Sequence, residues 1–189
     1  MSRLNAAGSS VTDIVGVQQE CSLDGESRVW FFPELGAESF RAGEMVCLSG
    51  SAANAVGLTK PGTDASGYGI VGFAADNASG YTSAFKGVMI ATPDNIFVGN
   101  VNNVTTSASA QTAATDLGQL YGLTSLSGTT YVDKTKTQTS TISCRVIGFY
   151  GGDTVPSFYG RVYFQVLQSK CQLTNNIWLN TSSPVTLQV

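Results

Sequence analysis

The side chains able to do acid–base or nucleophilic chemistry are few and of a restricted kind. The 189-residue chain contains no histidine, which excludes Ser-His-Asp and Cys-His catalysis, histidine metal sites and a histidine pH switch. An enzyme would have to rely on carboxylates, a lysine or a thiolate. Most of the acidic residues lie in predicted turns or at the ends of predicted strands, where solvated carboxylates are common. A carboxylate pair for glycoside hydrolysis is therefore the weaker alternative, and we expect the protein not to be an enzyme.

The cysteines and a glycine-rich segment also lack the spacing of a metal or cofactor site. The segment GYGIVG (67–72) is followed neither by a GK[ST] sequence nor by a predicted helix, so it indicates a strand with tight turns rather than a phosphate loop. We predict no metal, no cofactor and free thiols, with Cys47 and Cys144 as small buried hydrophobic residues; disulfides are the weaker alternative. The four cysteines, which follow no CxxC pattern, are Cys21, Cys47, Cys144 and Cys171.

Charge and hydropathy argue against nucleic acid and membrane as partners. Ten basic and thirteen acidic residues give a net charge of −3, and only 12% of the residues are charged, against roughly 25% in soluble domains. Such a chain offers no basic patch for phosphates or anionic lipids. No apolar run approaches the roughly 18 residues of a membrane span, and the N-terminal segment lacks the apolar core of a signal peptide. We therefore expect synthesis and folding in a cytoplasm.

The elements that must position these residues are predicted to be strands. From residue 27 onward, short apolar or alternating runs end at Gly, Pro, Asn or Asp, and no run has helical periodicity over three turns. The predicted fold class is all-β, a small β-barrel or β-sandwich domain with extended N- and C-terminal arms and less than about 10% helix. The predicted strands cover residues 28–32, 45–48, 55–59, 69–74, 85–91, 96–101, 118–123, 130–133, 141–150 and 160–173.

Three parts are predicted along the chain. Residues 1–24 form an N-terminal arm, residues 25–173 form the β-barrel or sandwich domain, and residues 174–189 form a C-terminal arm or a last strand. The arms are poor in large apolar side chains, so a disordered tail is an equal alternative for the first arm. Residues 100–115 are small and polar, which predicts a long exposed loop or an irregular strand.

Apolar side chains that the predicted core does not need are candidates for contacts with another subunit. In the strand around Trp30, Phe31 and Phe32, burying the first and third side chains places Phe31 on the opposite face. The aromatic residues between 149 and 164 exceed what one small barrel interior needs, so either an ordinary sandwich core or a subunit interface accounts for them. The full set of predicted contact residues is Val11, Ile14, Val15, Val17, Phe31, Phe158, Tyr159, Ile177, Trp178 and Leu179.

A series of short motifs between about residues 36 and 170 follows a distinctive order. Ala42 and Gly43 precede an apolar strand, the segment GIVGFA (69–74) follows, and Gly87 and Val88 lie in the next strand. In this order the motifs resemble those of the head decoration, or cement, proteins of tailed bacteriophages, in which they build a small barrel-like β-domain. The segments that carry the resemblance are Phe40–Leu48, Gly69–Ala74, Phe85–Ile90, Asp116–Leu123, Tyr131–Asp133, Val146–Gly148 and Arg161–Leu167.

The resemblance implies a structural virion protein on the outer surface of a capsid, made in the host cytoplasm. Its partners would be the major capsid protein and further copies of itself, with a trimer favoured over a dimer. Many weak contacts repeated by capsid symmetry would stabilise neighbouring capsid subunits through avidity, and the terminal arms would carry much of the attachment by strand addition. The N-terminal segment, residues 100–115 and the tail after Leu173 depart from the compact members of the family. A carbohydrate-binding or host-adhesion module of a head fibre or tail is the alternative, because β-rich chains with exposed aromatics also bind sugars.

Overall fold

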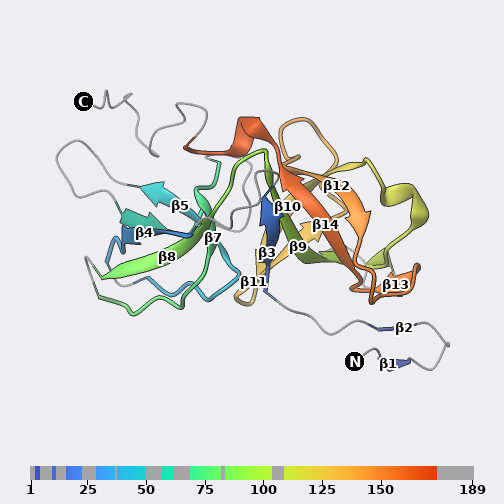
Figure 1. Ribbon diagram of the computed structural model, residues 1–189, viewed down its shortest axis with the longest axis horizontal. Coiled ribbons are helices and arrows are strands. Elements are labelled where there is room, and N and C mark those ends of the chain that lie inside the picture. The colour runs from blue at the N-terminus through green and yellow to red at the C-terminus, as the bar shows by residue number, and fades with distance from the viewer. Residues whose placement is uncertain are drawn as a thin grey trace.

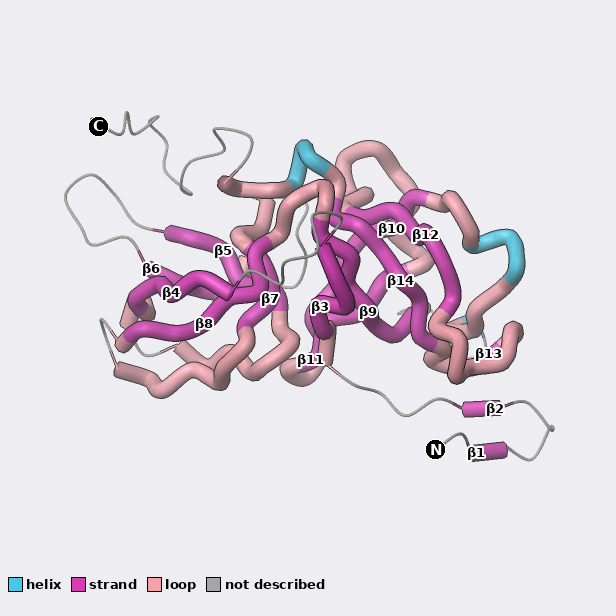
Figure 2. Tube along the Cα trace, in the orientation of Figure 1, coloured by secondary structure: helices cyan, strands magenta, loops and turns pink. Residues whose placement is uncertain are grey.

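The computed structural model of the chain forms two β-lobes that lie side by side along its long axis (Figure 1). Strands dominate the described residues, and the helical elements η2 (Ala114–Asp116) and η3 (Gln168–Lys170) are short 3-10 turns (Figure 2). The predicted all-β fold class is confirmed. The residues that the structure describes are 3–4, 10–11, 16–22, 29–36, 38–49, 57–61, 69–81, 84–103 and 109–173.

The first lobe is a five-stranded sheet in the order β4-β8-β7-β5-β6, with every neighbouring pair antiparallel. The sheet curls until its outer strands meet, because Glu34 forms a parallel bridge with Leu58, and the Leu35 N–H donates to the Leu58 carbonyl at 3.1 Å. A Cβ at Gly57 would lie 2.8 Å from the Leu35 nitrogen, so this close approach requires glycine. The strands are β4 (Val29–Pro33), β5 (Met45–Ser49), β6 (Gly57–Thr59), β7 (Gly72–Ala74) and β8 (Phe85–Ile90).

The second lobe is a closed five-stranded barrel in the order β11-β10-β12-β14-β9, with β9 pairing back to β11. Closure depends on a short parallel pairing of residues 101–102 with residues 132–133, whereas the other pairs in the ring are antiparallel. Side chains alternate along β14, so that Val162 and Phe164 point into the barrel. The strands are β9 (Asn95–Asn102), β10 (Leu120–Leu126), β11 (Thr129–Asp133), β12 (Cys144–Phe149) and β14 (Arg161–Val166).

Further strands lie outside the barrel ring. One of them, β3, pairs antiparallel with β9 and extends the barrel sheet. The others form a three-stranded sheet in the order β1-β2-β13, in which β2 and β13 are parallel. The bounds are β1 (Arg3–Leu4), β2 (Ser10–Val11), β3 (Gln18–Ser22) and β13 (Ser157–Phe158).

The two lobes share one aromatic core. Phe73 of β7 is fully buried, and its ring centroid lies 4.8 Å from that of Phe97 and 5.9 Å from that of Phe164. Both contacts have the edge-to-face geometry that aromatic pairs prefer. Met45 and Ile70 of the first lobe belong to the same buried cluster as the barrel residues, so the lobes pack as one body.

The chain after the barrel returns to the first lobe and ties the two together. The Ile70 N–H donates to the Lys170 carbonyl at 2.8 Å, and the Gln172 N–H donates to the Ile70 carbonyl at 2.8 Å. The buried Gln172 side chain accepts from the Leu48 N–H at 2.8 Å and donates to the Leu48 carbonyl at 2.9 Å. This side-chain amide therefore satisfies the main-chain groups that a neighbouring strand would otherwise pair.

The observed strands follow the predicted ones closely. Every predicted strand run overlaps an observed strand. The last predicted run, 160–173, is a strand only as far as Val166, after which the chain enters η3. Within the loop predicted over 100–115, the first residues complete β9 and residues 114–116 form η2, while residues 104–108 lie outside the described part.

The last part of the predicted N-terminal arm contributes to the barrel sheet. Residues 18–22 form β3, and Val17 beside them has only 1% of its surface exposed, within the barrel cluster. The prediction that Val17 contacts another subunit is corrected by this burial. The Val17 side chain lies beside Gly99 of β9, where a Cβ would be 3.1 Å from Val17 Cγ2, although the sequence around it is poor in large apolar residues.

Candidate interaction surface

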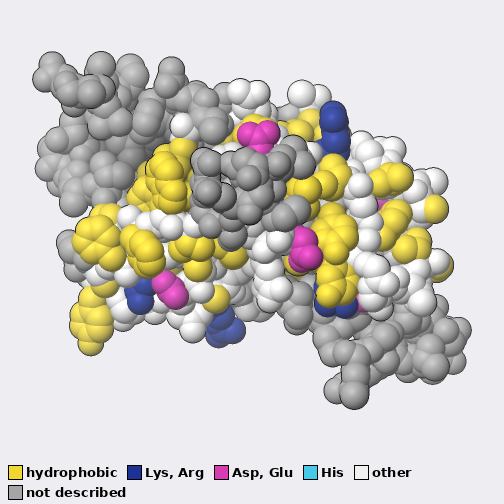
Figure 3. Space-filling model, viewed as in Figure 1, with side chains coloured by type: hydrophobic (Ala, Val, Ile, Leu, Met, Phe, Trp, Pro, Cys, Tyr) yellow, Lys and Arg dark blue, Asp and Glu magenta, His cyan; other side chains and the backbone are white. Residues whose placement is uncertain are grey.

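Large exposed apolar side chains gather on one edge of the first lobe. Phe31 on β4 is 64% exposed, Phe85 on β8 is 68% exposed, and Tyr81 in the loop before β8 is 74% exposed. We call Val29, Phe31, Tyr81 and Phe85 the aromatic face. Figure 3 shows hydrophobic side chains gathered over β4 and β8. Soluble proteins rarely leave an extended apolar surface open to water, so this exposure indicates a binding surface.

The register of β4 against β8 brings Val29, Phe31 and Phe85 to one side of the sheet. Antiparallel partners point to the same face, and Phe31 lies opposite Gly87 while Pro33 lies opposite Phe85. Phe32, between the two β4 positions, points the other way and packs against the core of the first lobe. Gly87 has no side chain, and a Cβ there would lie 3.0 Å from Val29 Cγ1 and 3.1 Å from Asp76 Oδ2, so neighbouring residues fill the space beside it.

Trp30 departs from the predicted burial. By alternation it lies on the same side as Phe32, yet 52% of its surface is exposed. The reason is its place on β4, an outer strand that only β8 covers along this stretch. The burial expected for Trp30 is wrong, whereas the position of Phe31 on the opposite face agrees with the structure.

A buried carboxylate lies directly after β4. Glu34 is 2% exposed, and it accepts hydrogen bonds from the Ser79 N–H at 2.5 Å, the Ser79 hydroxyl at 2.9 Å and the Tyr81 N–H at 3.1 Å. The Lys86 ammonium lies 4.0 Å from Glu34 Oε1. Burial by itself raises the pKa of Glu34, but these hydrogen bonds and the Lys86 charge outweigh it and hold the pKa below its ordinary value. The carboxylate is therefore ionised at neutral pH.

The side-chain cluster most like an active site lies in the second lobe, and its polar groups form hydrogen bonds with one another. Asp116 is 2% exposed and accepts from the Tyr121 hydroxyl and from the Lys134 ammonium, each at 2.8 Å. Lys134 also donates to the Gln111 carbonyl at 2.8 Å, and the Ala113 N–H donates to Asp116 at 2.8 Å. These groups bind one another, and their effect is to hold residues 111–116 against the barrel.

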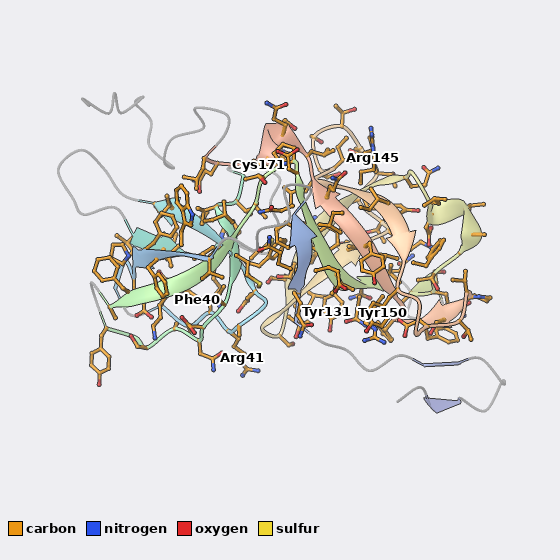
Figure 4. All side chains as sticks on the ribbon, in the orientation of Figure 1. Phe40, Arg41, Tyr131, Arg145, Tyr150 and Cys171 are labelled. Carbon is orange, nitrogen blue, oxygen red and sulfur yellow. The ribbon has the colours of Figure 1, made fainter. Side chains whose placement is uncertain are left out.

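An aromatic pair on the second lobe is also engaged within the protein. Tyr150 (Figure 4) follows β12, and the Arg161 guanidinium carbon lies 3.8 Å from its ring centroid. Asp153 accepts from Arg161 Nε at 3.1 Å and from Nη2 at 2.7 Å, and this hydrogen bonding raises the pKa of Arg161. A sugar that stacked on this face of Tyr150 would have to displace Arg161.

Other kinds of site have little support in the described residues. Within them, no group of three or more His, Cys, Asp or Glu side chains could hold a metal ion. In the same part of the chain, no helix is long and apolar enough to cross a membrane. A groove of about 330 Å³ between the lobes is lined mainly by Gly, Ala and Val side chains, and none of its lining residues is charged.

The cysteines that the structure describes with their side chains are buried and free, as predicted for Cys47 and Cys144. Burial, with the charge of Glu38 adding to it, raises the pKa of Cys47 to about 12, and burial also raises the pKa of Cys144. Thiols of this kind carry almost no thiolate at pH 8. We expect Cys47, Cys144 and Cys171 to react with DTNB only after denaturation, when all four thiols titrate. Labelling of Cys47 or Cys144 in the native protein, located by peptide mass spectrometry, would contradict this prediction.

The predicted contact residues that the structure describes do not form one surface. Phe31 lies on the aromatic face, Val17 lies in the barrel core, and Phe158 pairs with Val11 through the main chain. Tyr159 has a φ of 50° and donates its N–H to a main-chain carbonyl at 2.7 Å, as part of a turn. The predicted contact residues that lie outside the described part are Ile14, Val15, Ile177, Trp178 and Leu179.

Sequence reasoning missed three members of the aromatic face: Val29, Tyr81 and Phe85. For Phe85 a signal was present, because Phe85, Gly87 and Met89 alternate along one strand and must share a face. Tyr81 follows a glycine in a turn, and its type alone does not distinguish an exposed ring from a packed one.

Neither a family model nor a curated protein nor a solved structure matches the chain. The motifs of the chain and the geometry of the aromatic face are therefore the grounds on which a function is proposed.

Proposed function

We propose that this chain is a structural protein of a bacteriophage virion, which decorates the outer surface of the capsid and stabilises contacts between major capsid protein subunits. In this role it is made in the host cytoplasm, has no catalytic activity, and acts with further copies of itself, a trimer being favoured over a dimer. The observation that carries the proposal is the aromatic face, an exposed apolar surface on the lobe to which the first three resemblance segments belong.

Motif residues meet in the first lobe at the points where its backbone segments approach most closely. Gly43 donates its N–H to the Ala74 carbonyl at 2.7 Å, and a Cβ at Gly43 would lie 2.5 Å from the Gly16 Cα. A Cβ at Gly72 would collide with the Met89 carbonyl oxygen. Glycine is required at both positions, because any side chain there would overlap main-chain atoms. A curled lobe of this kind is what the resemblance to decoration proteins implies.

The composition of the aromatic face suits attachment to a large symmetric assembly. Burial of one large apolar side chain contributes about 1.5 to 3 kcal/mol, so the face supplies several kcal/mol for each copy bound. Association itself costs an amount of the same order, which makes a single contact weak. Repetition over the copies of an oligomer and the sites of a capsid converts weak contacts into stable attachment. None of the four residues is Asp, Glu, Lys or Arg, so binding should depend little on salt.

The double substitution of Phe31→Ser and Phe85→Ser is expected to weaken binding to expanded, undecorated capsids by about 100-fold or more, because two large apolar side chains no longer contribute. Both residues are mainly exposed, so the stability of the protein should change by no more than about 0.5 kcal/mol. Cosedimentation of the full-length protein with capsids gives the affinity and the number of copies bound.

A matched control removes exposed apolar side chains from the other lobe. Leu117 and Leu126 are 55% and 38% exposed, and Leu117→Ser with Leu126→Ser should leave capsid binding unchanged. Wild-type affinity in the Phe31 and Phe85 double variant would place the attachment elsewhere, with the terminal arms as the next candidates. Binding to host glycans, without a fixed copy number on capsids, would favour the adhesion alternative instead.

A further inference from the structure

The aromatic face is assembled from three segments that one carboxylate connects. Its rings come from β4, from β8 and from the loop before β8. Glu34, immediately after β4, binds that loop through the Ser79 and Tyr81 N–H groups and faces Lys86 of β8. Its own N–H donates to the Ala84 carbonyl at 2.8 Å, at the point where the loop enters β8. Every segment that contributes a ring to the face is therefore joined to Glu34.

We propose that Glu34 is the positioning residue of the capsid-binding face, because its buried carboxylate fixes residues 79–81 against β4 and β8 and so sets the place of Tyr81 relative to Phe31 and Phe85. This inference rests on the proposed function, since it names the residue that shapes the same surface. Glu34 is 2% exposed, so it acts through the residues that it holds and not by contact with the capsid.

Only an ionised carboxylate satisfies the arrangement around Glu34. One oxygen accepts from the Ser79 N–H, and the other accepts from both the Ser79 hydroxyl and the Tyr81 N–H. A glutamine side chain has one acceptor oxygen and one NH₂ group, so a donor would face donors whichever way the amide is turned. Protonation of the carboxyl has a similar effect, because one oxygen then carries a hydrogen.

The same geometry makes the loop sensitive to acid. Because the pKa of Glu34 is held below its ordinary value of about 4.3 by hydrogen bonds that exist only in the folded protein, the anchor is intact at neutral pH. It is lost as the pH falls through the folded-state pKa. Among the described residues, Lys86 is the charged side chain that faces Glu34.

The test uses Glu34→Gln in the full-length protein. Hydrogen exchange of the Ser79 and Tyr81 amides, followed by NMR, should become about tenfold faster or more, which corresponds to the loss of one charge-assisted hydrogen bond. Capsid binding should weaken by about the same factor, while the far-ultraviolet circular dichroism spectrum stays unchanged. Ser79→Ala removes one donor and should shift both measurements in the same direction by less. Asp153→Asn removes a carboxylate that pairs with Arg161 in the second lobe, and it should shift neither.

Unchanged exchange at Ser79 and Tyr81 in Glu34→Gln overturns the inference, and so does faster exchange with wild-type capsid binding. If Glu34→Gln fails to fold, Ser79→Ala decides, and unchanged exchange at Tyr81 in that variant overturns the inference. Failure of the proposed function gives a different result: the wild-type protein itself does not bind capsids, regardless of the amide exchange rates in Glu34→Gln. In that case both conclusions are overturned together.

Discussion

Replacing Phe73 with alanine is expected to lower the free energy of unfolding by about 3 to 5 kcal/mol, the range found when phenylalanine is removed from a close-packed core. Phe73 has no exposed surface, and its ring meets those of Phe97 and Phe164 at the junction of the lobes. The resulting cavity has little chance to close, because main-chain hydrogen bonds between Ile70 and residues 170–172 hold the lobes at a fixed separation. Urea denaturation followed by circular dichroism gives the free energy.

The control for Phe73 is a phenylalanine of the same lobe that packs against little. Phe85→Ala should change the free energy of unfolding by no more than about 0.5 kcal/mol, since Phe85 is 68% exposed. A loss below about 1 kcal/mol for Phe73→Ala would show that the two lobes do not depend on a common core. The expected result would instead establish that the junction is part of the folding unit.

The strands could be predicted because their signals are local. Apolar and alternating runs closed by Gly, Pro, Asn or Asp specify where a strand begins and ends, and the runs around β5, β8, β9 and β14 are of this kind. The burial of Cys47 and Cys144 followed for the same reason, since each lies inside such a run. Local patterns also place Phe31 and Phe32 on opposite faces of their strand, because side chains alternate along any strand, whichever strands lie beside it.

Closure of the barrel and the place of β3 could not be predicted from local patterns. The parallel pairing of β9 with β11 involves two residues on each strand, and neither carries a signal that distinguishes it from an unpaired strand end. The segment of β3 reads QQECS, which is polar, and it becomes a strand because β9 offers it an unpaired edge. The same polar composition predicts an extended arm that includes Val17, although the fold buries this side chain.

The aromatic face could be predicted only in part, because exposure depends on which strand lies at the edge of a sheet. Trp30 and Phe31 are adjacent in sequence and both carry large aromatic rings, yet the sequence does not reveal that β4 is an outer strand and that both remain largely exposed. The role of Glu34 was equally hidden. Its partners Ser79 and Tyr81 are 45 and 47 residues away, and only the folded lobe brings their main-chain donors to its carboxylate.

Replacing Asp116 with alanine is expected to cost about 3 kcal/mol or more of stability, because removal of one partner of a buried ion pair leaves the other partner uncompensated. The Lys134 side chain is 16% exposed, and its ammonium lies 2.8 Å from Asp116. Without the carboxylate, Lys134 keeps only the Gln111 carbonyl among the partners described above, and the Tyr121 hydroxyl loses its acceptor. Asp94→Ala, which removes an exposed carboxylate from the turn before β9, should change the stability by no more than about 0.5 kcal/mol.

The ionisation of Tyr121, which donates its hydroxyl to Asp116, provides a second measurement. Burial raises the pKa of Tyr121, and the hydrogen bond and negative charge of Asp116 raise it further. The stability that this shift contributes is complete below about pH 10, where an unfolded tyrosine titrates, and it is lost as the pH rises through the folded-state pKa. Asp116→Ala removes both the hydrogen bond and the negative charge. The phenol of the folded protein should therefore ionise at lower pH than in the wild type, as followed by absorbance at alkaline pH. A folded variant with a wild-type tyrosine titration and wild-type stability would show that the carboxylate does not hold the loop, because both effects derive from the same oxygen atoms.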